Sequence, residues 1–188
     1  MMKKILLIST LATLANLAQA QNYNLDPSHT YPSFEADHMG LSKWSGKFTR
    51  TSGTVVLDHN AKTGALDVKI DATSVDFGNA ALDQHVRSAD FLNVEKFPVI
   101  TYKSRAIHFA GNKPASADGD LTMMGVTKPV HLTINNFNCL IHPRLKREIC
   151  GAEVVGEFQR SDFGMNFGLP TFSPTIKLSV QVEAIKAE

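Results

Sequence analysis

Three groups of residues in this chain have types and spacing that could support chemistry. Ser28-His29 places a nucleophile beside a base, but without the Gly-x-Ser-x-Gly context in which many hydrolases present their serine. Asp162-Phe163-Gly164 matches the metal-binding tripeptide of protein kinases, yet the Gly-rich nucleotide loop and the catalytic-loop motif are both missing. The seven histidines include no His-x-His or His-x-x-x-His pair. We therefore predict no catalytic residue, no metal site and no cofactor, and we expect that the protein is not an enzyme.

The N-terminus has the pattern of a secretory signal peptide. Lys3 and Lys4 precede an apolar run over residues 5–17, and Ala18-Gln19-Ala20 forms a small-x-small cleavage site. The sequence predicts a signal peptide over residues 1–20 that is cleaved after Ala20, and a mature domain over residues 21–188. We expect a periplasmic protein if the source is a Gram-negative bacterium.

Cys139 and Cys150 are the only cysteines, and export would place both in an oxidising compartment. Their spacing differs from the Cys-x-x-Cys of redox enzymes. A structural disulfide is the default interpretation, and redox catalysis and metal binding are its alternatives.

Charge balance bears on the partners. Removing Lys3 and Lys4 from the 19 basic residues leaves 17 against 18 acidic ones, so we expect no nucleic-acid partner. One short basic cluster, Arg144-Leu145-Lys146-Arg147, is interpreted as a solvated loop. Weak, transient contact with an anionic membrane is the alternative.

Most of the mature chain has the alternating apolar and polar residues of β-strands. Apolar and polar residues alternate over 66–72, 130–134 and 176–184, which is typical of antiparallel strands with one buried face. Weaker patterns predict further strands over 33–39, 46–58, 99–109, 118–124 and 150–160. Turns are expected at residues 60–64, 111–114, 118–119 and 128–129.

The segment from Ala80 to Asn93 lacks alternation and has apolar residues at helical spacing, so it predicts one short α-helix. About eight strands with one helix favour an all-β fold, an eight-stranded antiparallel β-barrel that closes to remove exposed edges. A two-sheet sandwich is the alternative architecture. Periodicity alone does not decide whether the barrel encloses a ligand or is filled by its own side chains.

Ordered motifs along nearly the whole mature chain resemble the YceI-like family of exported, lipocalin-like barrels. The most specific block is residues 119–130, GDLTMMGVTKPV. The other blocks are Asp26-Pro27-Ser28-His29, Phe34, 38–41, 46–48, 53–55, 70–75, 85–92, 97–102 and 160–165. Residues 137–139 and 148–151 match the subset of this family that carries the two cysteines, which strengthens the prediction of a disulfide. Tyr31-Pro32 differs from the residue pair that is usual in this family at these positions, and it predicts an edge kink or a shifted start of the first strand.

The resemblance implies a lipocalin-like barrel whose apolar tunnel holds a polyisoprenoid, an isoprenoid quinone, a fatty amide or a similar long-chain lipid, as a carrier, store or sensor. The alternative is a structural or stress-related interaction protein with a filled barrel. On the first interpretation the residues that meet the ligand are Phe34, Ala36, His38, Phe48, Val68, Ile70, Phe91, Phe97, Ile100, Tyr102, Leu121, Met123, Leu132, Ile134, Phe158, Arg160, Phe163, Phe167, Leu178 and Val180.

Two further expectations concern the ends of the tunnel. Phe91 and Phe97 are expected to cover it as part of a helical lid, with Phe163, Phe167 and Phe172 as a second rim. The polar motif residues are expected to fix strand ends by hydrogen bonds, with contact of His38 or Arg160 to a ligand head group as the alternative. An exposed patch at the mouth would favour a homodimer that covers it.

Overall fold

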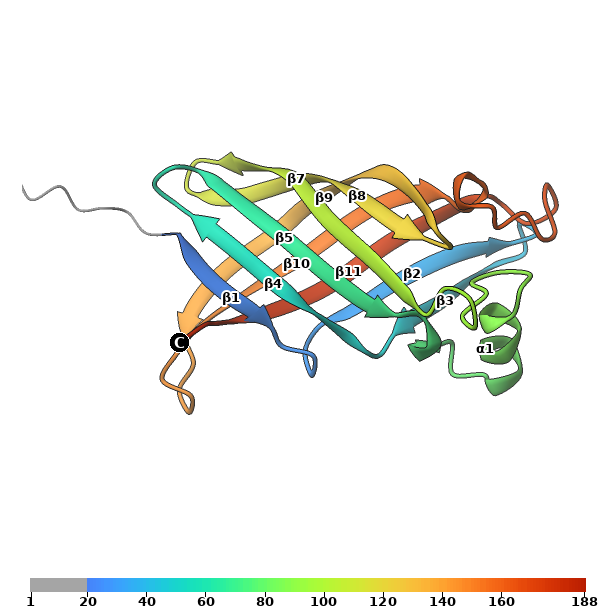
Figure 1. The fold of residues 1–188 in the computed structure, drawn as a ribbon, viewed down its shortest axis with the longest axis horizontal. Coiled ribbons are helices and arrows are strands. Elements are labelled where there is room, and N and C mark those ends of the chain that lie inside the picture. The colour runs from blue at the N-terminus through green and yellow to red at the C-terminus, as the bar shows by residue number, and fades with distance from the viewer. Residues whose placement is uncertain (1–19) are drawn as a thin grey trace, which may run out of the picture.

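The computed structural model describes residues 20–188, so the predicted signal peptide lies outside the described residues except for Ala20. The chain forms a long β-barrel with one short α-helix at one end (Figure 1). The strands are β1 (Gln21–Leu25), β2 (Tyr31–His38), β3 (Ser42–Phe48), β4 (Thr51–Asp58), β5 (Thr63–Asp71), β6 (Val75–Asp76), β7 (Val99–Ala110), β8 (Lys113–Met123), β9 (Val126–Ile141), β10 (Glu148–Gln159) and β11 (Thr175–Lys186). The helix is α1 (Ala80–Arg87), and single 3-10 turns lie at Ala72–Ser74 and Arg160–Phe163.

Eight strands close the barrel in the order β1-β4-β5-β7-β8-β9-β10-β11, and β11 pairs back onto β1. The branch β2-β3-β6 continues three of these strands. Leu25 of β1 lies opposite Ala184 of β11, and Tyr31 of β2 lies opposite Gln181 further along the same strand. The pairs β1/β2, β3/β4 and β5/β6 are thus each one strand of the barrel with an interruption. The predicted eight-stranded antiparallel barrel with one helix is confirmed.

Several predicted boundaries were wrong for local reasons. Residues 46–58 belong to two strands, because β3 ends at Phe48 and β4 begins at Thr51. Asp118-Gly119 lies inside β8, and the turn that joins β8 to β9 is Met124-Gly125, where both residues have positive φ. The helix ends at Arg87, six residues before the predicted end, because Ser88 takes an extended conformation.

Pro32, Pro114 and Pro129 lie in strands at positions that pair with a neighbouring strand on one side. Pro129 was predicted to lie in a turn, but it pairs with Asp120 in a part of β9 that β10 does not reach. Pro32 pairs with Val180 on one side, and its neighbour β3 begins to pair only at Ser33. A missing backbone N–H costs no ladder hydrogen bond at such positions. The strand that was predicted over residues 33–39 is β2, which starts at Tyr31, two residues before the predicted start.

Buried side chains form two clusters inside the barrel. The larger one lies toward α1 and includes Phe48, Ile100, Leu121 and Met123. The smaller one lies toward the chain termini and includes Tyr23, Leu57 and Cys150. Among the described residues, no helix is long and apolar enough to cross a membrane.

Candidate functional site

An apolar cavity of about 610 Å³ runs along the inside of the barrel. At one end its wall includes Phe91 and Phe167, next to α1. At the other end it includes Leu25 and Phe137, near the bond between Cys139 and Cys150. We call these the helix end and the disulfide end. They lie at opposite ends of the barrel, and both described termini are at the disulfide end (Figure 1).

Inward side chains in the middle of the barrel are only half-buried, although they point away from the outer surface. This holds for Val68, Leu132, Ile134 and Val180, all of which line the cavity. In a close-packed core the same positions would be almost fully buried. The middle of the barrel is therefore a cavity and not a filled core.

Most of the residues predicted to meet a ligand line this cavity. They are Phe34, Ala36, His38, Phe48, Val68, Ile70, Phe91, Ile100, Tyr102, Leu121, Met123, Leu132, Ile134, Phe158, Arg160, Phe167, Leu178 and Val180. Strand alternation places the residues of one face together, which is why a sequence pattern could select them. Contact of these side chains with a ligand stays a prediction.

Phe97 and Phe163 do not line the cavity, contrary to prediction. Phe97 packs on the outer rim against the β8–β9 turn, where a Cβ added at Gly125 would lie 2.9 Å from its ring. Phe163 is 1% exposed and meets the cavity-lining Phe158 edge-on at 5.3 Å between ring centroids. Phe163 therefore supports the wall from behind.

Several residues that line the cavity were not predicted, because they follow irregularities in strand pairing that reverse the alternation. The pairing of β7 with β8 shifts register between Ser104 and Ala106, and this brings Ile107 to the inner face. A second shift in the pairing of β9 with β10 does the same for Phe137. A β-bulge adds one residue and so reverses which parity faces inward. Phe172 was predicted at the rim and does line the cavity.

The helix end is covered by α1, which places one face over the cavity. Leu82, His85 and Val86 line the cavity at the spacing of one helical face. Asn79 caps the helix, because its side-chain oxygen accepts hydrogen bonds from the backbone N–H groups of Ala81 and Leu82.

Aromatic rings complete this cover. Phe91 and Phe167 lie 5.3 Å apart between centroids, and the His85 ring is 5.2 Å from each. Phe167 is 43% exposed although it also lines the cavity. The cover at this end is therefore thin, because one ring separates the cavity from the outside.

Arg160 fixes the loop over residues 161–174 at the same end. Its guanidinium donates to the carbonyls of Met165 (2.7 Å), Ser173 (3.2 Å) and Phe172 (3.3 Å), and it is 4% exposed. Burial lowers the pKa of Arg160. Its donors are directed at the loop, so this residue has the structural role expected of the polar motif residues. Arg87 acts similarly by donating to the carbonyls of Thr73 and Val75.

His38 lines the cavity at the helix end, and its contact with a ligand head group stays a prediction. Its ring stacks on Trp44 at 4.2 Å and lies 5.2 Å from Phe172. Within residues 20–188, no hydrogen bond occupies its ring nitrogens. The imidazole can therefore donate to or accept from a polar group at the cavity mouth.

Tyr102 is a polar group deep in the wall, and the barrel itself satisfies it. Its hydroxyl lies 3.2 Å from the carbonyl of Ala117 and 3.1 Å from that of Val130. Gly119 makes room for the ring, since an added Cβ would lie 2.4 Å from it. Burial raises the pKa of Tyr102, so the phenol stays neutral. The interior consequently offers a ligand little hydrogen bonding.

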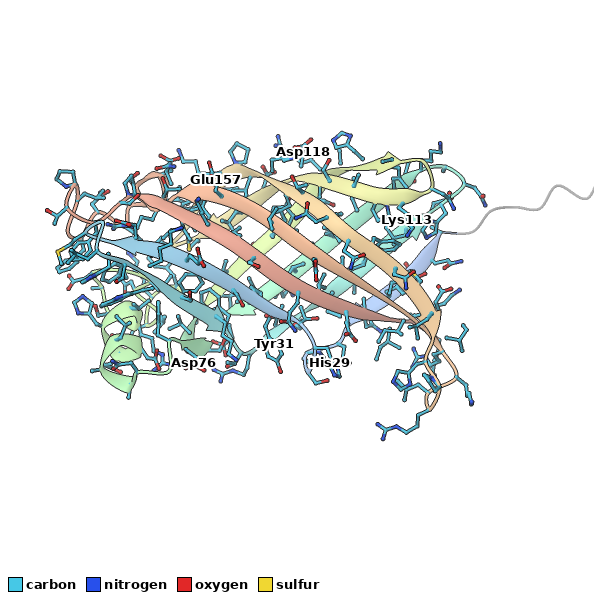
Figure 2. The ribbon with its side chains drawn as sticks, turned by 180° about the vertical axis from the view of Figure 1, so that it is seen from behind. His29, Tyr31, Asp76, Lys113, Asp118 and Glu157 are labelled. Atoms are coloured by element: carbon cyan, nitrogen blue, oxygen red, sulfur yellow. A yellow bond between two sulfur atoms is a disulfide. The ribbon has the colours of Figure 1, made fainter. Side chains whose placement is uncertain are left out.

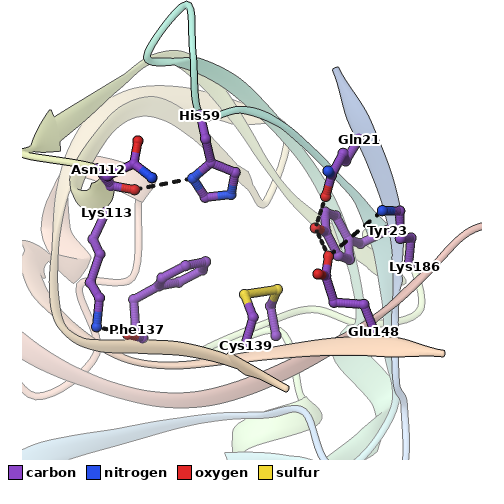
Figure 3. Close-up of a disulfide and its surroundings, with 10 residues drawn as sticks. Gln21, Tyr23, His59, Asn112, Lys113, Phe137, Cys139, Glu148 and Lys186 are labelled. Carbon is purple, nitrogen blue, oxygen red and sulfur yellow. Dashed lines mark hydrogen bonds and ion pairs between the residues drawn. A yellow bond between two sulfur atoms is a disulfide. The ribbon is translucent and has the colours of Figure 1, made fainter. Parts of the chain in front are cut away.

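At the disulfide end, several side chains project into the mouth of the barrel (Figure 3). The predicted disulfide is confirmed: Cys139 and Cys150 are directly opposite on β9 and β10, with 4.1 Å between Cα atoms. Tyr23 is 1% exposed, and its hydroxyl lies 2.5 Å from Glu148 Oε1. Burial and this hydrogen bond raise the pKa of Tyr23. The rings of His59 and Phe137 lie 6.3 Å apart at the same end, between the cavity and solvent.

The residues that suggested a hydrolase form a surface turn between β1 and β2. His29 Nδ1 lies 2.8 Å from Asp26 and 3.0 Å from Ser28 Oγ. A Ser-His-Asp relay needs the serine and the aspartate on different ring nitrogens, so this is not a catalytic triad. His29 lies on the outside of the barrel (Figure 2).

The same turn approaches Glu183. Potential ligand atoms of Asp26, His29 and Glu183 lie within 4.8 Å of one another, which the sequence did not predict. Hydrogen bonds within the turn account for the arrangement of Asp26 and His29, since Ser28 and His29 both bond the carboxylate. The absence of a metal site stays a prediction.

Comparison with known proteins gives a consistent picture along the chain. The model of the YceI-like domain matches residues 23–184. Protein YceI of Escherichia coli O157:H7 is 35% identical over 191 aligned residues, which cover 98% of this chain and 99% of the relative. Protein YceI of Salmonella arizonae has the same identity and coverage.

Solved structures share the barrel. A Campylobacter jejuni YceI protein has a TM-score of 0.70 at 27% identity, covering 81% of this chain and 90% of its own. BcnA of Burkholderia cenocepacia has a TM-score of 0.70 at 22% identity, covering 85% of this chain and 98% of its own. A polyisoprenoid binding domain of Saccharophagus degradans, implicated in plant cell wall breakdown, has a TM-score of 0.65 at 14% identity over 88% of this chain and 98% of its own.

Proposed function

This chain belongs to the YceI-like domain family, and on that premise we propose that it binds a polyisoprenoid or similar long-chain amphiphile inside the barrel. The observation that carries the proposal is the apolar cavity along the barrel axis, with half-buried aliphatic side chains in its middle. The name of the Saccharophagus degradans domain, which shares the fold, points to the same class of ligand.

The chemistry of the wall selects for an apolar chain. At roughly 30 Å³ per water-sized group, the cavity has room for about twenty such groups. Ten buried CH₂ groups would contribute about 8 kcal/mol before the entropy cost of binding is subtracted. An aliphatic tail gains this energy without a charged partner, whereas a polar ligand would lose hydrogen bonds to water in this cavity.

The two ends suggest an orientation. At the helix end His38 and His85 face the cavity, and a head group placed there could hydrogen-bond to them. Deeper in the barrel, toward Leu57 and Ile107, the wall is aliphatic and suits the tail. We propose that the ligand enters at the helix end, past α1 and Phe167, with its head group remaining near His38.

The cellular role follows from the expected compartment. With the predicted signal peptide and the Cys139–Cys150 disulfide, we propose a periplasmic carrier, store or sensor of lipid that does no covalent chemistry. An exported protein with an apolar cavity can shield a hydrophobic molecule from water in the periplasm.

The first test is extraction of protein purified without detergent. Mass spectrometry of the organic extract should show a prenyl or acyl lipid, and delipidated protein should rebind an isoprenoid quinone. If the extract holds no lipid and the quinone does not bind, the proposal is wrong.

Two substitutions sharpen this test. Val180→Trp puts a large ring into the open middle of the cavity, so delipidated protein should keep its free energy of unfolding within about 1 kcal/mol while bound lipid falls at least about tenfold. Ile70→Trp acts in the packed cluster, where overpacking should cost about 1–3 kcal/mol. Ser179→Trp, on the exposed side of β11, is the control for both.

A further inference from the structure

The hairpin that joins β9 to β10 projects away from the barrel wall at the disulfide end (Figures 1 and 2). Its apolar side chains are open to solvent: Leu140 is 52% exposed, Ile141 61% and Leu145 44%. Exposed apolar residues grouped at one projecting point commonly mark a contact surface. These three residues, together with Arg144 and Lys146 on either side of Leu145, are called the hairpin tip below.

The charged residues of this segment are all basic. The sequence has no Asp or Glu between Asp120 and Glu148. Within residues 20–188, neither Arg144 nor Lys146 forms an ion pair. Nearby acids are already paired, since Glu148 lies 3.9 Å from Lys186, and Glu188 lies 3.5 Å from Arg147.

The apolar surface continues onto the outer wall of the barrel. Cys139 and Cys150 point inward, so their neighbours Leu140 and Ile149 point outward. Leu140 lies opposite Ile149, and Ile149 lies opposite Ile185 on β11. Leu140, Ile149 and Ile185 therefore form a row of aliphatic side chains across three strands, next to the hairpin tip on the outer wall.

The hairpin is also pre-ordered. His142 Nδ1 accepts hydrogen bonds from the backbone N–H groups of Arg144 (3.2 Å) and Leu145 (3.1 Å). The backbone N–H of Lys146 bonds the carbonyl of His142 at 2.9 Å, and the disulfide fixes the base of the hairpin. A surface that is already ordered loses little conformational entropy on binding.

We propose that the hairpin tip docks the protein onto an anionic lipid bilayer, with the disulfide end toward the membrane and the helix end toward the aqueous side. Free cations beside exposed aliphatic side chains match a bilayer interface, where anionic head groups lie above the acyl region. This changes the interpretation of residues 144–147 as a merely solvated loop. The docking is separate from ligand binding in the cavity, because it uses only the outer surface.

The helix end is the competing surface. Met39, Leu41, Trp44 and Phe167 are exposed there as well. Charges at that end are mixed, since Asp37 lies opposite Lys43 and Asp90 lies near His85, whereas the hairpin tip carries cations alone. Because Trp44 is the only tryptophan, its fluorescence reports on this end alone.

The test is sedimentation of the full mature protein with two kinds of vesicle, phosphatidylcholine alone and phosphatidylcholine with about a quarter phosphatidylglycerol. Binding is expected only to the anionic vesicles and should weaken as salt is raised. The double variant Arg144→Gln with Lys146→Gln should bind about twenty-five-fold more weakly, at roughly fivefold for each cation removed. Lys43→Gln with Lys128→Gln removes the same charge from exposed positions elsewhere and should bind as the parent does.

The orientation is tested separately. Brominated acyl chains in the anionic vesicles should leave Trp44 emission unchanged, and they should quench a tryptophan introduced by Pro143→Trp. Quenching of Trp44, or loss of binding on Leu41→Ser, would show that the helix end docks and would overturn the proposal. Equal binding by the Arg144/Lys146 variant would also overturn it, as would a dimer in sedimentation equilibrium that this variant dissociates. Unchanged thermal melting confirms that each variant is folded.

Discussion

The two ends of the barrel close the same cavity by different means. At the disulfide end, the bond between Cys139 and Cys150 joins the neighbouring strands β9 and β10, and the side chain of Tyr23 is almost fully buried. At the helix end, closure comes from α1 and a loop that Arg160 holds through backbone carbonyls, with the half-exposed ring of Phe167 at the mouth. Hydrogen bonds and a few aromatic contacts can open and reform, whereas a covalent link between strands cannot. If the barrel binds a lipid as proposed, the helix end is therefore the end at which we expect the ligand to exchange.

The largest expected effect is at the helix end. Arg160→Met removes three hydrogen bonds to backbone carbonyls of the loop, so we expect a loss of about 3 kcal/mol in the free energy of unfolding. The loop over 161–174 should also become susceptible to proteolysis before the barrel unfolds. Denaturant unfolding and limited proteolysis measure the two effects.

Arg50→Met is the matched control for this prediction. Arg50 pairs with Asp71 at 2.8 Å, but its side chain is 60% exposed, so its removal should cost less than about 1 kcal/mol. Similar losses for the two variants would contradict the structural role assigned to Arg160.

The second effect is at the disulfide end. Cys139→Ala with Cys150→Ala should cost about 3 kcal/mol, since a short loop is no longer closed in the unfolded chain. The cost should appear as a lower denaturant midpoint, while the exchange rate of a pyrene-labelled fatty acid should not change. Faster exchange in this variant would mean that the disulfide end also opens.

The third prediction compares the two ends through single aromatic rings. Phe167→Ala removes the contacts with His85 and Phe91 and should speed release of the pyrene-labelled fatty acid by up to about tenfold. Phe137→Ala is the counterpart at the disulfide end and should leave the release rate near that of the parent. Stopped-flow fluorescence measures both, and the opposite ranking would place the portal at the disulfide end.

The smallest effect concerns pH and the turn between β1 and β2, which belongs to neither end. Burial alone would raise the pKa of Asp26, but hydrogen bonds from Ser28 and His29 outweigh it and lower that pKa below 3.8. The hydrogen bond to Asp26 raises the pKa of His29 above 6.5. The Asp26 contribution is lost as pH falls through its lowered pKa, and the His29 contribution is lost as pH rises through its raised pKa.

The pair should therefore stabilise the fold most between about pH 4 and 6.5. Melting temperatures across this range should show a shallow maximum that Asp26→Asn flattens. A profile that the substitution leaves unaltered would mean that the pair contributes nothing to stability.

Much of this architecture follows from the sequence by itself. Alternation in segments such as 66–72 and 176–184 identifies strands, because side chains of a strand point to opposite faces in turn. The same alternation selected Val68, Leu132 and Val180 as inward residues, and the structure places all three on the cavity wall. The two cysteines indicated their own bond, since they were the only candidates and export favours oxidation.

Other features depend on contacts between distant segments, and only the tertiary structure decided them. Ile107 and Phe137 face inward because bulges reverse the strand parity, and a bulge depends on pairing with a neighbouring strand. Phe97 and Phe163 have the residue type of a lid but pack on the rim and behind the wall, because their partners Gly125 and Phe158 come from other elements. Whether the barrel was filled or hollow depended on how all its inward side chains meet across the axis. A period-two pattern fixes the direction of each side chain, but only closure of the barrel fixes the distance that remains between them.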